Sequence, residues 1–241
     1  MSFVPRRTDR PSPPQADRLP VSVVVPCHSE LRFGNLCDTV ASLRAQEPAP
    51  TEIVVVVDHS PALRERIERE LPGVTVLANR FTRGVSGTRN TGGLHVVTPL
   101  VVFVDDDITA EPGWLAQMLV PFADPDVVGV GGAILPRWET AEPIWLPSEF
   151  LWVVGGSYRD MPTGGPVRNV WSANLAVRRD AFLAVGGFRT DFGKVGDRSR
   201  PEDTEFCLRI SRATGKDWWY APNAAVWHAV PAGRADFRYF L

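Results

Sequence analysis

The sequence has no long hydrophobic run, little cysteine and no excess of positive charge. No stretch of about 18 apolar residues occurs, so we expect no membrane-spanning helix, although peripheral association with a membrane stays open. The N-terminus is rich in Arg and Pro and has no apolar segment, so no secretory signal is expected. A formal net charge of -2 argues against nucleic acid as a partner, because that function needs a basic surface.

Only three cysteines occur, Cys27, Cys37 and Cys207, and their spacing does not fit a metal site. We therefore expect free thiols in a reducing compartment, and a cytoplasmic location. Hydrophobic residues make up 44% of the chain, which is enough for a full-sized core. A length of 241 residues allows one large α/β domain or two small ones.

Apolar runs and amphipathic helical patterns alternate from about residue 20, after an Arg- and Pro-rich segment, residues 1–19, that we expect to be a disordered tail. Strands are predicted over residues 21–25, 53–57, 74–77 and 100–104. Helices are predicted after the first strand, with Leu36, Val40 and Leu43 on one face, and over residues 62–71 and 84–97. This alternation predicts an α/β fold with a mainly parallel sheet and right-handed crossovers.

The second half of the sequence is less regular. We predict helices over residues 114–122, 178–185 and 202–213, strands over 127–133, 218–220 and 225–227, and loops over 136–166 and 189–200. The chain ends on an apolar segment, residues 238–241, which would be unusual for a complete domain. A native chain that continues beyond Leu241 is therefore one expectation.

Three acids, Asp105, Asp106 and Asp107, follow the predicted strand at 100–104. Carboxylates at the tip of a buried strand need compensating charge, and clustered oxygen ligands suit Mg2+ or Mn2+. Ligands of open α/β sheets bind at the carboxyl ends of the strands. The triplet therefore predicts a metal site for a phosphorylated substrate. Taken alone, it is also compatible with a solvated acidic turn.

Further polar residues follow other predicted elements in a fixed order. Pro26-Cys27-His28 ends the first strand and Asp58 the second, Gly84 to Asn90 opens a helix of small residues, and Glu202-Asp203 opens a later helix. The order and spacing of these motifs resemble glycosyltransferase family 2 over about residues 21–230. That resemblance implies the GT-A fold, a Rossmann-like sheet flanked by helices with a smaller mixed acceptor-side region.

The resemblance implies a single catalytic domain over residues 20–241, with a nucleotide-binding half at 20–110 and a donor-sugar and acceptor half at 111–241. It also implies a role for each matching residue. Pro26, His28, Glu30, Asp58, Arg89, Asp105 and Asp106 would bind the nucleotide, Asn174 the donor sugar, and Asp107 and His228 the metal, while Asp203 or Glu202 would be the catalytic base.

The implied reaction is an inverting transfer from a nucleoside diphosphate sugar, with a uridine diphosphate sugar as the default, to an acceptor hydroxyl. A carboxylate takes the proton of the acceptor, and Mn2+ or Mg2+ neutralises the diphosphate that leaves. The acceptor stays open between a glycan, a lipid-linked glycan and a small molecule. Asp58-His59-Ser60-Pro61 and His28-Ser29 depart from the family pattern at the predicted base pocket, so the nucleobase is open too.

Two other functions compete with this interpretation. A sugar nucleotidyltransferase would need a Gly-rich basic loop near the first strand, and residues 26–30 hold neither Gly nor a basic residue other than His28. A non-catalytic binding module would be suggested by loss of the metal-binding acids or of the base, and all of these residues are present. Each residue also has an ordinary interpretation: Glu202-Asp203 as first-turn helix acids, His228 as a core residue, Asp58 as a turn former and Arg89 as a solvated helix residue.

Overall fold

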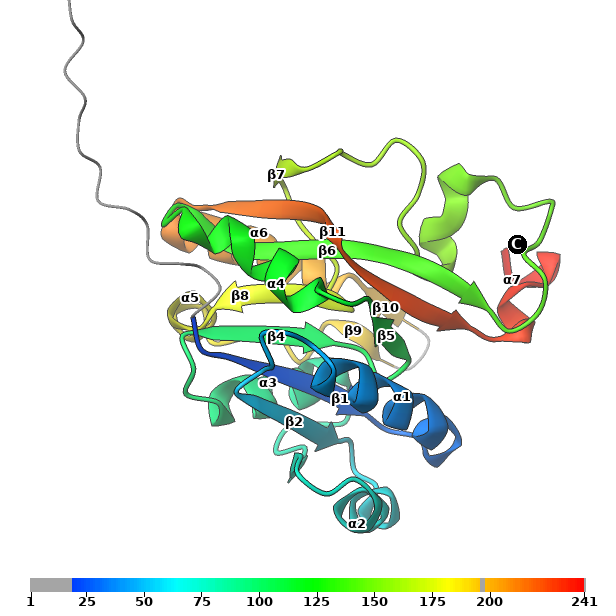
Figure 1. Ribbon diagram of the computed structural model, residues 1–241, viewed down its shortest axis with the longest axis horizontal. Helices are drawn as coiled ribbons and strands as arrows, with labels where there is room; N and C mark the ends of the chain where they lie inside the picture. Colours follow the sequence, from blue (N-terminus) through cyan, green and yellow to red (C-terminus); the bar gives the residue numbers. More distant parts are fainter. Residues whose placement is uncertain (1–18, 196–197, 241) are drawn as a thin grey trace, which may run out of the picture.

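The computed structural model describes residues 19–195 and 198–240, so the predicted tail lies outside the described residues except for Leu19. Nine strands form one sheet in the order β3-β2-β1-β4-β8-β6-β11-β5, and β7 pairs with β11 (Figure 1). Helices lie on both faces of this sheet, which confirms the predicted α/β class.

The first half alternates strand and helix as predicted, and its four strands are parallel neighbours. Its elements are β1 (Val21–Cys27), α1 (Phe33–Arg44), β2 (Glu52–Val57), α2 (Pro61–Glu70), β3 (Thr75–Ala78), α3 (Val85–His95) and β4 (Leu100–Val104), with a short 3-10 helix, η2 (Glu30–Arg32), before α1. Every residue of β1 and β4 is buried, because both faces of the sheet are covered.

The core lies in two layers, one on each face of the sheet. Val23 and Val25 of β1 belong to the layer that contains α1, α2 and α4, whereas Val24 belongs to the layer that contains α5 and α6. Helix α3 packs closely on this second face, where a Cβ atom at Gly92 would lie 2.4 Å from Cγ1 of Val24. The missing side chain at Gly92 thus lets the second half of α3 lie close to β1.

The second half continues the same sheet. Its strands are β5 (Ile108–Ala110), β6 (Val127–Trp138), β7 (Gly165–Val167), β8 (Asn174–Arg178) and β11 (Asp217–Val230), and β9 (Gly193–Val195) and β10 (Arg198–Arg200) form a separate hairpin. Its helices are α4 (Trp114–Leu119), η3 (Val120–Ala123), η4 (Ser148–Val154), α5 (Arg179–Ala184), α6 (Glu202–Thr214), η5 (Ala232–Arg234) and α7 (Phe237–Phe240). The long strands β6 and β11 run parallel, side by side (Figure 1).

Several predicted boundaries were wrong. Strand β8 was not predicted, and it lies antiparallel between β4 and β6. The two short strands at 218–220 and 225–227 are one strand, β11, with an irregular register between Ala221 and Val226. Strand β6 continues to Trp138, β1 continues past Pro26 to Cys27, and the predicted loop at 189–200 holds the β9–β10 hairpin.

The predicted loop at 136–166 was also wrong in part, since it contains η4 and the first residues of β7. Among the described residues, no helix combines the length and the apolar character that a membrane crossing requires.

Candidate active site

The acid triplet lies between β4 and β5, at the carboxyl edge of the sheet. Asp106 and Asp107 are buried, with only 4% and 7% of their surface exposed, so the solvated-turn interpretation does not hold for them. Their charges are compensated by Arg32 of η2. Its Nη1 atom lies 3.1 Å from Oδ1 of Asp106 and 2.9 Å from Oδ2 of Asp107.

The two buried acids differ in their readiness to ionise. Burial and the negative charge of Asp107 raise the pKa of Asp106 to about 7. Burial alone would raise the pKa of Asp107 as well, but His228 and Arg32 hold that pKa below its usual value. Asp107 therefore ionises more readily than Asp106.

Asp107 and His228, the two predicted metal ligands, lie together. Nε2 of His228 is 3.5 Å from Oδ1 of Asp107, and both side chains are buried. Oδ1 of Asp107, Oδ2 of Asp106 and Nδ1 of His228 are buried without a hydrogen-bond partner. Of these atoms, Oδ1 of Asp107 faces Nε2 of His228, and this pair of ligands fits a divalent cation. No group of three or more His, Cys, Asp or Glu side chains suited to a metal occurs among the described residues.

A site with so few protein ligands suits a hard cation that takes its remaining ligands from water and from substrate phosphates. The chemistry of the ligand set is thus that of a metal bound together with a phosphorylated molecule.

A cavity of about 360 Å³ opens beside the acids. Five of the predicted nucleotide-binding residues line it: Pro26, His28, Asp58, Asp105 and Asp106. Glu30 is exposed and is not among the lining residues. Arg32 lines this cavity and also a second one, of about 430 Å³, that contains Asp107. Arg32 therefore stands where the two cavities meet.

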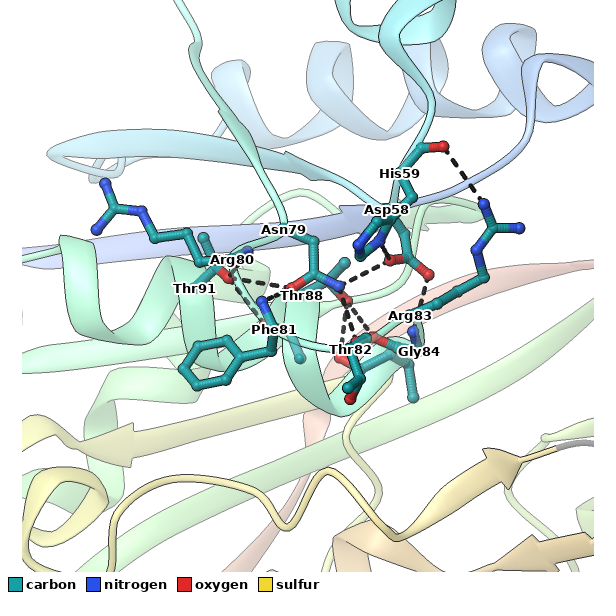
Figure 2. A network of polar contacts seen from close by, with 12 residues as sticks. Asp58, His59, Asn79, Arg80, Phe81, Thr82, Arg83, Gly84, Thr88 and Thr91 are labelled. Atoms are coloured by element: carbon teal, nitrogen blue, oxygen red, sulfur yellow. Dashed lines mark hydrogen bonds and ion pairs between the residues drawn. The ribbon is translucent and has the colours of Figure 1, made fainter.

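The cavity of about 360 Å³ is here called the nucleotide-side cavity, and Asp58 fixes one of its walls through hydrogen bonds (Figure 2). Its Oδ1 lies 2.7 Å from Nδ2 of Asn79 and 2.7 Å from Nδ1 of His59, and its Oδ2 accepts the backbone N–H of Gly84 at 2.9 Å. Burial opposes ionisation, but the hydrogen bonds from Asn79 and His59 keep the pKa of Asp58 below its usual value. Asp58 thus both lines the cavity and orders the segment that leads into α3.

Arg89 is a buried link between the two halves of the chain. Its Nη2 lies 2.8 Å from Oδ1 of Asp105 and its Nη1 lies 2.9 Å from Oε1 of Glu202, while its own side chain is only 3% exposed. The solvated-helix interpretation of Arg89 was therefore wrong. Both of its terminal nitrogens contact these two acids. Its contact with the nucleotide therefore stays a prediction.

Asp203, the next residue after Glu202, has a different environment. It is half-buried, its Oδ1 accepts the backbone N–H of Thr204 at 2.7 Å, and it also accepts the backbone N–H of Ser172. Burial and the neighbouring charge of Glu202 raise the pKa of Asp203. A carboxylate with a raised pKa is a stronger base than an ordinary Asp carboxylate. The ion pair with Arg89 is made by Glu202 and not by Asp203.

Asn174 lies elsewhere than the sequence predicted. Its side chain is fully buried, its Oδ1 accepts Nε1–H of Trp114, and its Nδ2 donates to the carbonyls of Ala133 and Ala224, each at 2.9 Å. Both amide hydrogens are therefore used inside the fold, where they tie β8 to β6 and β11. The predicted contact of Asn174 with a donor sugar is not supported by this geometry.

Sequence reasoning missed Arg32 and Asn79, and it placed His59 at the predicted base pocket without a role. Arg32 is 74 residues away from Asp106 in the chain, so no local spacing marks the pair. Asn79 directly follows β3, and a polar residue at the end of a parallel strand is a signal that would have identified it.

The family model described as "Glycosyl transferase family 2" matches residues 22–186, more than half of the chain. The chain belongs to glycosyltransferase family 2. It is therefore an enzyme that transfers a glycosyl group.

Curated relatives agree with this assignment. The chain is 34% identical, over 227 residues, to a glucosyl-dolichyl phosphate glucuronosyltransferase of Haloferax volcanii, with 92% of this chain and 72% of the relative covered. It is 29% identical, over 223 residues, to a pre-mycofactocin glycosyltransferase of Mycobacterium tuberculosis, with 90% of this chain covered. It spans only 44% of the length of that second relative.

Two solved structures share the fold. GalNAc-T7 with UDP, GalNAc and Mn2+ superposes with a TM-score of 0.65 at 19% identity, covering 88% of this chain and 44% of that one. The mannosyltransferase PcManGT of Pyrobaculum calidifontis, in complex with GDP-Man and Mn2+, gives 0.64 at 20% identity, covering 93% and 61%. At such identities the likeness establishes the GT-A fold, as predicted.

Proposed function

We propose that this glycosyltransferase moves a sugar from a nucleoside diphosphate sugar to an acceptor hydroxyl, with inversion and with a divalent cation. The proposal rests on a set of acids at one edge of the sheet that ion pairs with Arg32 and Arg89 connect. Arg32 contacts Asp107, the partner of His228, and also lines the cavity that contains Asp58 and Asp105. Arg89 joins Asp105 to Glu202, the neighbour of Asp203.

The donor side of the proposal rests on the cavity of about 360 Å³. Asp58 would accept an N–H of the nucleobase there, His28 would lie against the ring, and Asp105 would face the ribose. Uracil and guanine both offer an N–H to a carboxylate, so Asp58 alone does not choose between them. We propose a uridine diphosphate sugar, in line with the family resemblance.

Asp107 and His228 would hold Mn2+ or Mg2+, with the diphosphate and water as further ligands. When bound, the cation supplies positive charge that stabilises the departing diphosphate. Arg32 adds a second positive charge at the same place, since it already contacts Asp106 and Asp107.

Asp203 would act as the base that takes the proton of the acceptor hydroxyl. Its raised pKa favours that role, and Glu202 is paired with Arg89. A single attack from the side opposite the diphosphate inverts the anomeric centre, and no protein nucleophile is needed. The three cysteines are free thiols, and Cys27 and Cys207 are buried. Free thiols are typical of a reducing compartment, which we propose to be the cytoplasm.

The first experiment is calorimetry of UDP binding with and without Mn2+. The wild type should bind more tightly with the metal, and Asp107→Ala should lose that difference because half of the protein's ligand set is gone. Asp126→Ala is the matched control, since Asp126 is exposed at the start of β6, at the opposite edge of the sheet. Metal-dependent binding that survives in Asp107→Ala would reject this ligand assignment.

The second experiment is turnover of a panel of UDP sugars by Asp203→Asn. The variant should keep metal-dependent UDP binding and lose roughly 10²–10⁴ in rate, the usual contribution of a general base. Transfer at the wild-type rate would exclude Asp203 as the base and make Glu202 the next residue to test.

A further inference from the structure

An open groove lined by aromatic side chains lies outside the nucleotide-side cavity. Trp152, Tyr158 and Trp171, here called the aromatic groove, enclose about 410 Å³ together with Glu149. Trp152 is 54% exposed and Tyr158 is 38% exposed, while Trp171 is half-buried. None of these residues lines the cavity that contains Asp58.

The rings of the aromatic groove are arranged so that their faces stay accessible. The centroids of Tyr158 and Trp171 lie 6.1 Å apart with 54° between the ring planes, so the two rings do not cover one another as a parallel stack would. An aromatic face carries partial negative charge. It attracts the weakly positive C–H groups that line one face of a pyranose ring, while the hydroxyls of that ring point outward.

Polar planar groups surround the same rings. Nη1 of Arg159 lies 3.0 Å from Oε1 of Glu149, and both side chains are well exposed. Nε of Arg168 donates to Oδ1 of Asn169 at 2.9 Å, and both residues line an adjoining cavity that shares Tyr158 and Trp171. A guanidinium has five N–H donors, so each Arg keeps donors for further bonds. Hydroxyl groups can use these donors, whereas a hydrocarbon tail cannot.

The chain segment that carries Trp171 also contacts the first turn of α6, which holds the proposed base. Trp171 precedes Ser172, whose backbone N–H bonds to the carboxylate of Asp203. Two residues earlier, Nδ2 of Asn169 lies 3.4 Å from Oγ1 of Thr204, the residue after Asp203. The backbone of segment 169–172 therefore lies along the first turn of α6, which links the residue that carries one ring of the groove to the residues beside the base.

From the exposed rings, the neighbouring polar side chains and the contact of segment 169–172 with the first turn of α6, we propose that the aromatic groove binds a sugar ring of the acceptor. The acceptor is then a glycan or a glycoside whose terminal sugar receives the transferred sugar, and the groove sets its specificity. This inference rests on the proposed function only for the role of Asp203. The groove itself is a saccharide site whether or not the donor is a uridine diphosphate sugar.

The test measures binding of methyl glucoside, methyl galactoside and methyl mannoside by tryptophan fluorescence and saturation-transfer NMR, without nucleotide. At least one glycoside should bind the wild type, and Trp152→Ala should weaken it about tenfold or more, the factor that corresponds to 1.4 kcal/mol of lost contact. Arg159→Ala should weaken the same glycoside, because it removes hydroxyl partners. Leu183→Ala, at an exposed apolar side chain of α5, is the control and should change nothing.

UDP calorimetry with Mn2+ on Trp152→Ala shows that the fold and the donor side are intact. Failure of metal-dependent UDP binding in the wild type would contradict the proposed function and leave the glycoside result standing. Glycoside binding that Trp152→Ala and Arg159→Ala leave unchanged would overturn the inference. So would binding of a polyprenyl phosphate in detergent that depends on Trp152 while no glycoside binds, since the groove would then be a lipid site.

Discussion

Replacing Arg89 by Met should destabilise the protein strongly, although it leaves the length of the side chain almost unchanged. The substitution removes the only positive partner that the structure shows for Asp105 and Glu202 among the described residues. Arg89 itself is 3% exposed, so water does not reach its place easily. The two acids would then keep their charges beside a buried thioether.

The size of the effect follows from the exposure of the two acids. Removal of one partner of a fully buried ion pair costs roughly 3–5 kcal/mol. Asp105 is 33% exposed and can be rehydrated, so its share should resemble a surface pair, at most about 1 kcal/mol. Glu202 is 17% exposed and retains most of the penalty. We expect a total of about 3 kcal/mol, which for a chain of this length lowers Tm by roughly 6–12 °C.

Urea titration and thermal unfolding followed by circular dichroism measure this loss. Arg212→Met, at an exposed position of α6, is the control and should stay within about 0.5 kcal/mol of the wild type. Arg89→Met combined with Glu202→Gln should recover more than half of the lost free energy of unfolding, because the unpaired charge of Glu202 is removed. Equal stability of Arg89→Met and Arg212→Met would refute the reasoning.

Three further predictions concern the metal, the pH profile and the core. Arg32→Ala should bind Mn2+ without nucleotide about fivefold more tightly in electron paramagnetic resonance titrations, since about 1 kcal/mol of competing ion pair is removed; unchanged affinity would contradict this. Because burial and Glu202 raise the pKa of Asp203, its base form is lost as pH falls through that raised pKa. The acid limb of the transfer rate should therefore lie at higher pH than a free Asp would give, and a rate profile with a limb at the ordinary Asp range would disprove it. Gly129→Ala places a Cβ 2.2 Å from the buried ring of Trp218 and should cost about 1–3 kcal/mol in urea titrations, whereas Gly34→Ala has open space and should cost nothing.

Strands β1, β2 and β4 were predictable because their apolar runs are buried on both faces. Every residue of β4 is buried, and the run ends where the acids begin. Strand β8 was not predictable in the same way. Its five residues form a strand because β4 and β6 lie on either side, and such long-range pairing leaves no mark on a short segment.

The candidate site was likewise predictable only in part: the positions of its residues were predicted, but most of their contacts were not. The positions of Asp58, Asp107 and His228 were predicted from strand ends and family spacing, and the structure brings Asp107 and His228 together. The partners of the site's acids were not predicted. Arg32 reaches Asp106 and Asp107 from a distant part of the chain, and Arg89 joins Asp105 to Glu202. Asn174 was predicted to contact the donor sugar, but its side chain is turned into the fold by a hydrogen bond from Trp114, which is 60 residues away.

The position of β8 limits how this enzyme can be recombined with its relatives. An antiparallel strand from the second half of the chain fills the gap between β4 and β6, with Val104 opposite Asn174 and Gly131 opposite Leu175. A chimaera that joins residues 20–110 of this chain to the second half of a relative must reproduce that register, since a slip of one residue turns every side chain of β8 to the other face. Exchange of the segment between β6 and β7, residues 139–164, leaves the register untouched. New acceptor specificities are therefore better sought by grafting that segment than by swapping half-domains.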